Sequence, residues 1–436
     1  MVMRLTIDDV DFDTRFEALL GLKRESDPDV RDTARNIIAQ VRDGGDKALI
    51  ELTRKFDRFE IADGAGLQIT DAEIDAAIAN VPAEEQKALA HAAERINAFH
   101  ERQKPSDDMF EDAVGTTLGH RWTPISAVGV YVPGGTASYP SSVLMNTIPA
   151  KVAGVPRVAM VVPTPDGQIN PLVLLAARLA GVDEVYRIGG AQAVAALAYG
   201  TETIAPVDKI TGPGNAWVSA AKREVFGKVG IDMIAGPSEI LVVADGANDP
   251  AWIGADLLSQ AEHDTAAQSI LITDDAGFAD KVAEAVEAHL AVLPRGEIAA
   301  QSWADHGAII VIDDMAQAGP LIDRIAPEHL ELAVDDPKAM LTDFSHAGSV
   351  FMGRQTPEAV GDYIGGPNHV LPTSRSARFS SGLNVLDFMK RSTLLGCSPE
   401  ALQAIGPDAV RLAQSEGLGA HAMSVALRLN MPWQKD

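Results

Sequence analysis

A glutamate and a histidine, Glu328 and His329, stand side by side directly after a proline. On a regular helix or strand such neighbours point apart, but on an irregular segment both side chains can face one cleft. An imidazole, with an unperturbed pKa of about 6.5, is the common general base at neutral pH, and a carboxylate beside it can activate water. The pair is a candidate for acid–base catalysis, although a solvated turn is the other interpretation of this segment.

A polar stretch at 256–264 offers ligands for a cation. If a helix that begins near Pro250 continues through it, Gln260 and His263 lie three residues apart on one helix face and can reach one ion or ligand. This spacing is weaker evidence than an H-E-x-x-H motif, and a polar helix end before a strand is the alternative. Because Cys397 is the single cysteine of the sequence, a metal here must bind mainly to nitrogen and oxygen atoms.

Two glycine-containing loops each carry a carboxylate and an imidazole. The first contains Asp362 and His369, and the second begins with Glu416 and ends with His421. Glycine lets a backbone approach a ligand closely. A plain surface turn also explains either loop, so each is a weak candidate by itself.

The glycine fingerprint G-x-G-x-x-G of dinucleotide-binding proteins is absent. Two other glycine turns, at 189–192 and 212–215, each stand between a predicted strand and a predicted helix. The second opens its helix, where free backbone amides can bind phosphate. Both would lie at the carboxyl ends of strands, where ligands bind in open α/β sheets, although ordinary turns have the same appearance.

The elements that must position these residues begin with helices. Apolar residues spaced three and four apart predict a helix over 29–56 that breaks at 44–46, and a helix over 71–102 that is interrupted at Pro82. After Ser380 the chain is again predicted to be helical.

Between these helical regions, short apolar strands alternate with helices twice over. The predicted strands are 127–132, 158–162, 184–188, 209–211, 240–244, 269–273, 308–312 and 348–352. Strands without polar alternation are buried on both faces, as in a parallel sheet covered by helices. The sequence therefore predicts an α/β protein with two domains of similar build.

The composition is that of a globular protein of 436 residues, 46% hydrophobic and 22% charged, which suggests about two to four domains. The net charge of −25, from 36 basic and 61 acidic residues, argues against non-specific binding to nucleic acid or anionic lipid. The N-terminus lacks the apolar run of a secretory signal, and the apolar stretch 172–182 is shorter than the roughly 20 residues of a membrane span. We therefore expect a soluble, cytoplasmic protein without nucleic-acid or membrane partners.

The chain resembles the histidinol dehydrogenase family over essentially its whole length. The resemblance rests on short blocks that follow one another in the family's order, each modest alone and specific together. They are VGVYVPGG at 128–135, GGAQ at 189–192, GPGN at 212–215, AGPSE at 235–239, DLLSQAEH at 256–263, PEHL at 327–330, GPNHVLPT at 366–373 and EGLGAH at 416–421.

This resemblance implies the oxidation of L-histidinol through L-histidinal to L-histidine, the last step of histidine biosynthesis, with two NAD molecules reduced. It also implies one divalent metal ion per subunit, usually zinc, that holds the substrate. The implied ligands are Gln260, His263, Asp362 and His421. The implied fold has two incomplete Rossmann-like domains of similar build plus small helical N- and C-terminal segments, which accounts for NAD binding without the fingerprint.

Individual roles follow from the same resemblance. His329 matches the base that takes the alcohol proton as hydride leaves, and Glu328 matches the residue that helps activate water for attack on the aldehyde. The positions that match substrate contacts are Ser238, Gln260, His263, His329, Asp362, Glu416 and His421. Those that match nucleotide contacts are Tyr131, Gln192 and Asn215.

The family forms homodimers of intertwined subunits, so the resemblance implies that Glu416 and His421 serve the active site of the neighbouring subunit. We predict four parts of the chain. A small N-terminal segment covers 1–25, and a discontinuous first α/β domain with the metal and catalytic residues covers 26–130 and 240–383. An inserted second α/β domain with the NAD contacts covers 131–239, and a C-terminal helical domain that reaches the partner covers 384–436.

Other functions fit part of the pattern. A related dehydrogenase on the same scaffold could oxidise a different amino alcohol or a diol. A metal-dependent hydrolase could use zinc, Glu328 and His329 to activate water for amide cleavage, and it would release product without NADH. A non-catalytic nucleotide-binding protein leaves this pair and the nitrogen and oxygen ligands unexplained.

Overall fold

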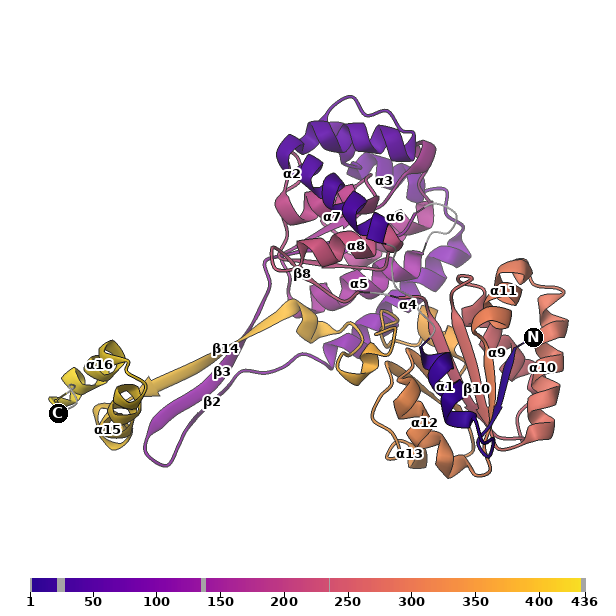
Figure 1. Ribbon diagram of the computed structural model, residues 1–436. Helices are drawn as coiled ribbons and strands as arrows, with labels where there is room; N and C mark the ends of the chain where they lie inside the picture. The colour runs from indigo at the N-terminus through magenta and orange to yellow at the C-terminus, as the bar shows by residue number, and fades with distance from the viewer. Residues whose placement is uncertain (1, 22–27, 135–138, 235, 433–436) are drawn as a thin grey trace. The chain divides into compact units, whose positions relative to one another are not determined.

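The computed structural model describes residues 2–21, 28–134, 139–234 and 236–432 (Figure 1). The end of the predicted segment 1–25, Gly135 of one block and Ala235 of another lie outside the described residues. The chain divides into two compact units, which are described separately. The first comprises Met1–Gln103 and Ser126–Phe388, and the second Lys104–Ile125 and Met389–Asp436. Among the helices of the described residues, none has the length and apolar character needed to cross a membrane.

A six-stranded sheet in the first unit has the order β1-β11-β10-β9-β12-β13, and all its neighbouring pairs are parallel. Its strands are β1 (Met3–Thr6), β9 (Glu239–Ala244), β10 (Gln268–Thr273), β11 (Ala308–Val311), β12 (His329–Ala333) and β13 (Ser349–Met352). The predicted strands that correspond to β9, β10, β11 and β13 are confirmed to within a residue at each end. β1 and β12 come from segments in which no strand was predicted.

Helices cover both faces of this sheet because its central strands are buried on both sides. Ile240 and Leu241, which are consecutive on β9, belong to opposite apolar clusters. The helices over one face are α9 (Pro250–Ala261), α10 (Ala276–Leu290) and α11 (Gly296–His306). Those over the other are α1 (Phe12–Leu20), α12 (Ala318–Ile325) and the short α13 (Pro337–Met340). The short helix α14 (Glu358–Tyr363) follows β13.

A five-stranded parallel sheet in the same unit has the order β6-β5-β4-β7-β8. Its strands are β4 (Ala127–Tyr131), β5 (Arg157–Val161), β6 (Glu184–Tyr186), β7 (Lys209–Thr211) and β8 (Gly230–Ile231). The helices between them are α5 (Pro140–Ala153), α6 (Pro171–Ala180), α7 (Gly190–Tyr199) and α8 (Ala216–Val225). The predicted α/β class, with parallel strands and covering helices repeated twice, is confirmed.

The helices of the first hundred residues are α2 (Pro28–Asp57), α3 (Asp71–Ile78) and α4 (Ala83–Glu101). The backbone of α2 is non-helical at Gly45, with φ 53° and ψ −140°, so the predicted break is confirmed. Val41 and Leu49 of α2 share a buried cluster with Val194 of α7 and Val218 of α8. The apolar stripe of α2 therefore packs on the helices of the five-stranded sheet.

This packing differs from the predicted domain division, which grouped 26–130 with 240–383. In the structure, α2 shares its core with elements of 131–239, while β1, from the predicted N-terminal segment, is an edge strand of the six-stranded sheet. The apolar spacing of a helix reveals that one face is buried but not which sheet will bury it.

The second unit is a three-stranded antiparallel sheet followed by two helices. The strands, in the order β14-β3-β2, are β2 (Asp108–Glu111), β3 (Thr116–Pro124) and β14 (Met389–Cys397), and the helices are α15 (Pro399–Ser415) and α16 (Gly419–Leu429). The prediction that the chain is only helical after Ser380 is wrong for β14. Nearly all side chains of this strand are exposed, so it lacks the buried apolar run that predicts a strand.

Short 3₁₀ turns complete the connections of the first unit. They are η1 (Gly64–Leu67), η2 (Pro165–Gly167), η3 (Met315–Gln317), η4 (Ser376–Arg378) and η5 (Val385–Phe388).

Candidate active site

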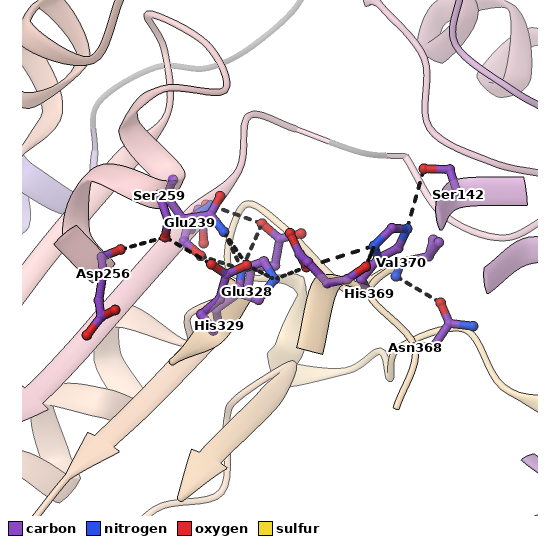
Figure 2. A network of polar contacts seen from close by, with 12 residues as sticks. Ser142, Glu239, Asp256, Ser259, Glu328, His329, Asn368, His369 and Val370 are labelled. Carbon is purple, nitrogen blue, oxygen red and sulfur yellow. Dashed lines mark hydrogen bonds and ion pairs between the residues drawn. The ribbon is translucent and has the colours of Figure 1, made fainter. Parts of the chain in front are cut away.

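His329 opens β12 and is buried, with 3% of its surface exposed. Its Nδ1 atom lies 2.9 Å from the backbone carbonyl oxygen of Glu239 on the neighbouring strand β9 (Figure 2). A carbonyl oxygen only accepts, so we assign the proton of the neutral ring to Nδ1. The Nε2 atom is buried and has no hydrogen-bond partner within the described part of the chain. It is therefore available to accept a proton from a bound molecule.

Glu328 is held by the same residue of β9. Its Oε2 atom accepts the backbone N–H of Glu239 at 2.9 Å and lies 3.7 Å from Nδ1 of His329. Burial, and then the charge of Glu239, raise the pKa of Glu328 well above its ordinary value. Burial lowers the pKa of His329. The two side chains thus form a compact pair in which burial favours the protonated carboxyl and the neutral imidazole over their charged forms.

Gln260 connects this pair to the end of α9. Its Nε2 atom donates to Oε1 of Glu358 at 2.9 Å and lies 3.3 Å from Nδ1 of His329. Ser259 donates from Oγ to the other carboxylate oxygen of Glu358 at 3.0 Å. Oε1 of Gln260 is buried and has no partner among the described residues. An amide oxygen that is buried and unsatisfied is a ready ligand for a cation.

Helix α14 brings two carboxylates to His329. Nε2 of His329 lies 3.6 Å from Oε1 of Glu358 and 3.8 Å from Oδ1 of Asp362, and one ligand atom of each residue lies within 4.8 Å of the others. Burial, followed by the charge of Glu358, raises the pKa of Asp362 to about 9. This concentration of buried acidic groups would be neutralised by a divalent cation.

Two further histidines border the cluster. His263 lies just beyond α9 and is exposed, and its charge lowers the pKa of both His329 and His369. His369 is partly exposed at its surface, and desolvation of its ring lowers its pKa to about 4. Its Nδ1 atom lies 3.0 Å from the backbone oxygen of Asp362, and its Nε2 lies 3.4 Å from Oγ of Ser142 at the start of α5 (Figure 2). The neutral ring of His369 thus joins the Asp362 segment to α5.

The residues expected to contact the nucleotide gather around one cavity of about 280 Å³ at the carboxyl ends of β4, β6 and β7. Tyr131 and Gln192 are buried there, and the Tyr131 hydroxyl accepts the backbone N–H of Gly190 at 3.0 Å. Asn215 accepts the N–H groups of Trp217 and Val218 at the start of α8. These two amides, expected to be free for phosphate, are therefore satisfied within the chain.

The remaining predicted residues lie as follows. Ser238 is half-buried directly before β9, and its carbonyl oxygen accepts the N–H of Gln268 at 2.9 Å. Glu416 caps the C-terminal end of α15, and His421 lies in the first turn of α16, both with exposed side chains. Both belong to the second unit. In the first unit, the fold brings Glu328, His329, Gln260 and Asp362 together.

Sequence analysis missed Glu358, which contacts more members of the cluster than any predicted ligand does. Its signal was present: it follows Pro357 and precedes Asp362 by four residues, a spacing that puts both carboxylates on one face of a helix. The helix is only six residues long, which is too short for an apolar stripe to reveal it.

The chain is similar to known proteins over nearly its whole length. A family model of histidinol dehydrogenase matches residues 22–429. Histidinol dehydrogenase of Rhodospirillum rubrum is 65% identical over 435 residues, which cover 100% of both chains, and that of Ruegeria pomeroyi is 64% identical over 420 residues, which cover 96% of this chain and 97% of the relative. The crystal structure of histidinol dehydrogenase from Elizabethkingia anophelis is 37% identical, covers 98% of each chain and has a TM-score of 0.94 to this structure.

Proposed function

The chain belongs to the histidinol dehydrogenase family, and from this premise we propose that it oxidises L-histidinol through L-histidinal to L-histidine with NAD as hydride acceptor. Histidinol dehydrogenase is the oxidoreductase of the last step of histidine biosynthesis. The observation that carries the proposal is the buried, unpartnered Nε2 atom of His329 beside Glu328 and the carboxylates of α14.

The donors around His329 suit a zinc ion, one per subunit. Oε1 of Gln260 is buried and has no partner among the described residues, and a nearby cation would offset the desolvation that raises the pKa of Asp362. His263 follows Gln260 by three residues, just beyond the end of α9. These residues, with His421 from a second copy of the chain, would hold the ion. Bound there, it would bind the imidazole and amino nitrogens of the substrate and so fix its orientation.

In the first oxidation, Nε2 of His329 takes the hydroxyl proton of the alcohol while hydride leaves the carbon that bears it, which gives the aldehyde. In the second, water adds to the aldehyde carbon, and Glu328 in its ionised form takes a proton from that water. Its raised pKa makes Glu328 a stronger base than an exposed glutamate. Once Glu328 has taken the proton of the water, the hydrate anion gives the carboxylic acid by loss of a second hydride alone. NAD, when bound, would supply the hydride acceptor for each oxidation.

We assign the cofactor to the cavity formed by Tyr131, Gln192 and Asn215. Gly212, in the turn that precedes Asn215, supports the assignment because its φ is +114° and an added Cβ atom would lie 2.0 Å from the backbone oxygen of Tyr131. Only glycine fits at this position. The turn therefore approaches β4 closely and leaves the space above the strand ends open for a ligand.

The second unit supports a homodimer with shared active sites. The buried apolar cluster between its helices is small and contains Val410, Ala422 and Ala426, with a few partly buried neighbours. Large apolar side chains are exposed on its strands and helices, among them Met109, Phe110, Leu395, Leu412 and Leu427. So much exposed apolar surface on so small a core is typical of an interface. A second copy of the chain would cover it and receive the exposed Glu416 and His421.

Complementation tests the proposal in a cell. A histidine auxotroph that lacks histidinol dehydrogenase, carries this chain and is supplied with histidinol should grow without histidine. Failure to grow, with the protein expressed and folded, would show that another alcohol is the substrate.

A further inference from the structure

Two carboxylic side chains near the cluster, the buried Glu331 and the partly buried Asp256, are not used by the proposed reaction. Glu331 follows His329 by two residues on β12, so both side chains leave the strand on the same face. Asp256 precedes Gln260 by four residues on α9, so these two also share a face. The pair Asp256–Glu331 therefore follows the same pattern as Gln260 and His329, about one turn away along α9 and two residues away along β12.

The contacts of Glu331 lead directly to α14. Its carboxyl group hydrogen-bonds with that of Asp256 and also accepts the backbone N–H of Glu358. Glu358 is the first residue of α14, and Pro357, at the N-cap position, makes no side-chain hydrogen bond to the helix. Glu331 thus supplies from β12 the acceptor that the first turn of α14 lacks in its own sequence.

The charges of the pair are consistent with this arrangement. Burial, and then the charge of Asp256, raise the pKa of Glu331 to about 9, while burial raises the pKa of Asp256 to about 6. Near pH 7.5, one proton therefore resides on Glu331, which donates to Asp256. Oε2 of Glu331 is fully buried with no N–H or O–H donor against it in the described residues. An ionised Glu331 would leave that oxygen charged and unsatisfied.

We propose that Glu331, held by Asp256, is a positioning residue that fastens α14 so that Glu358 and Asp362 face His329. This inference rests on the proposed function, because it assigns Glu331 its effect through the zinc site. Glu331 touches neither substrate nor cofactor. Its removal should therefore weaken zinc binding and turnover together, while the cofactor cavity on the other sheet is unaffected.

The test compares two substitutions of one residue. Glu331→Gln keeps the size, the donor and the acceptor of the protonated acid, and it should retain zinc affinity and kcat within about twofold. Glu331→Leu removes the acceptor for the Glu358 N–H and should weaken zinc affinity and lower kcat at least about tenfold, with KM for NAD unchanged. Zinc affinity is measured by competition with a chromophoric chelator and Zn²⁺ alone, so this readout does not depend on turnover.

A matched control removes a buried polar side chain at the opposite end of β12. Asn248 donates to the carbonyl oxygen of Ala333 at 2.7 Å, so Asn248→Leu should lower Tm and leave zinc affinity at the wild-type value. If Glu331→Leu does not fold, Glu331→Asp, which withdraws the carboxyl from the Glu358 N–H, should show the weaker zinc binding instead.

The outcomes separate the two proposals. Wild-type protein that forms no NADH from histidinol contradicts the proposed function. If the wild-type protein is active but the Glu331→Leu variant binds zinc as tightly as wild type, the positioning role is overturned. The same holds for the Glu331→Asp variant if that is the one measured. A Glu331→Gln variant that is as defective as Glu331→Leu also overturns it.

Discussion

The Nδ1 atom of His329 lies 2.9 Å from the backbone carbonyl oxygen of Glu239, and the N–H of that same residue donates to Glu328 at 2.9 Å. One residue of β9 therefore orients both members of the proposed catalytic pair, Glu328 and His329, through its backbone. Because backbone groups in the centre of a sheet move little, the imidazole is fixed with Nε2 toward the substrate side before any ligand binds.

His329→Asn should lower kcat by about 10²–10⁴-fold, the range expected for loss of a general base. Its zinc content should not change, because His329 is not a proposed ligand. Steady-state kinetics and metal analysis of the purified variant measure both quantities. His289→Asn is the control, since the bond of His289 among the described residues is to the carbonyl oxygen of Ala251 on α9, and this variant should leave kcat unchanged. Loss of zinc from His329→Asn would contradict the assignment.

Tyr131→Phe should raise KM for NAD about five- to tenfold and leave kcat within twofold. The substitution leaves the Gly190 N–H without its acceptor, a loss of about 1 kcal/mol. Initial rates at varied NAD concentration measure the change. Tyr186→Phe removes a hydroxyl that bonds to Glu184 on the same sheet, outside the cavity, and should not change KM. Equal KM values for NAD in Tyr131→Phe and wild type would show that Tyr131 does not contribute to cofactor binding.

Mixed dimers of His329→Asn and His421→Asn chains should recover activity that neither variant has alone. If each active site takes His329 from one chain and His421 from the other, a mixed dimer has one intact site of two. Random assortment then gives about a quarter of wild-type activity in the unseparated mixture and about half in the isolated mixed dimers. Co-expression with two affinity tags isolates the mixed dimers. Inactive mixed dimers would show that each site is built from one chain.

The stability of the wild-type protein should fall, relative to Glu331→Gln, as the pH rises from about 5 to about 9. Folding raises the pKa of Glu331 from 4.5 to about 9, so the folded state keeps a proton that the unfolded state releases within this range. The free energy of unfolding therefore decreases with pH through the same range, and glutamine removes this titration. Denaturant unfolding at several pH values measures the difference. Parallel curves for the two proteins would show that Glu331 does not titrate in the folded state.

Much of the fold was predictable because it depends on local apolar pattern. The strands that became β4, β9 and β10 are continuous apolar runs, and such runs are buried in parallel sheets wherever the fold places them. The break of α2 at Gly45 was also predictable, since its φ of 53° favours glycine. The packing of α2 on α7 was not, because it depends on how distant surfaces fit together.

The site divides in the same way. Glu328 and His329 could be predicted because they are adjacent and unusual in their context. Glu358 lies on a helix of six residues. Its place in the site could not be predicted because it depends on a contact with Gln260, which is nearly a hundred residues earlier in the chain. Asp256 and Glu331 have ordinary sequence surroundings and become notable only because the fold brings the partly buried Asp256 against the buried Glu331.

The most direct test of the account measures NADH formed per L-histidinol consumed, by absorbance and by chromatography of the product, with and without a zinc chelator. The account predicts two NADH and one L-histidine for each histidinol, with turnover abolished by the chelator and restored by Zn²⁺. One NADH per substrate with free histidinal as the product, or full activity of protein shown to be free of metal, would contradict it.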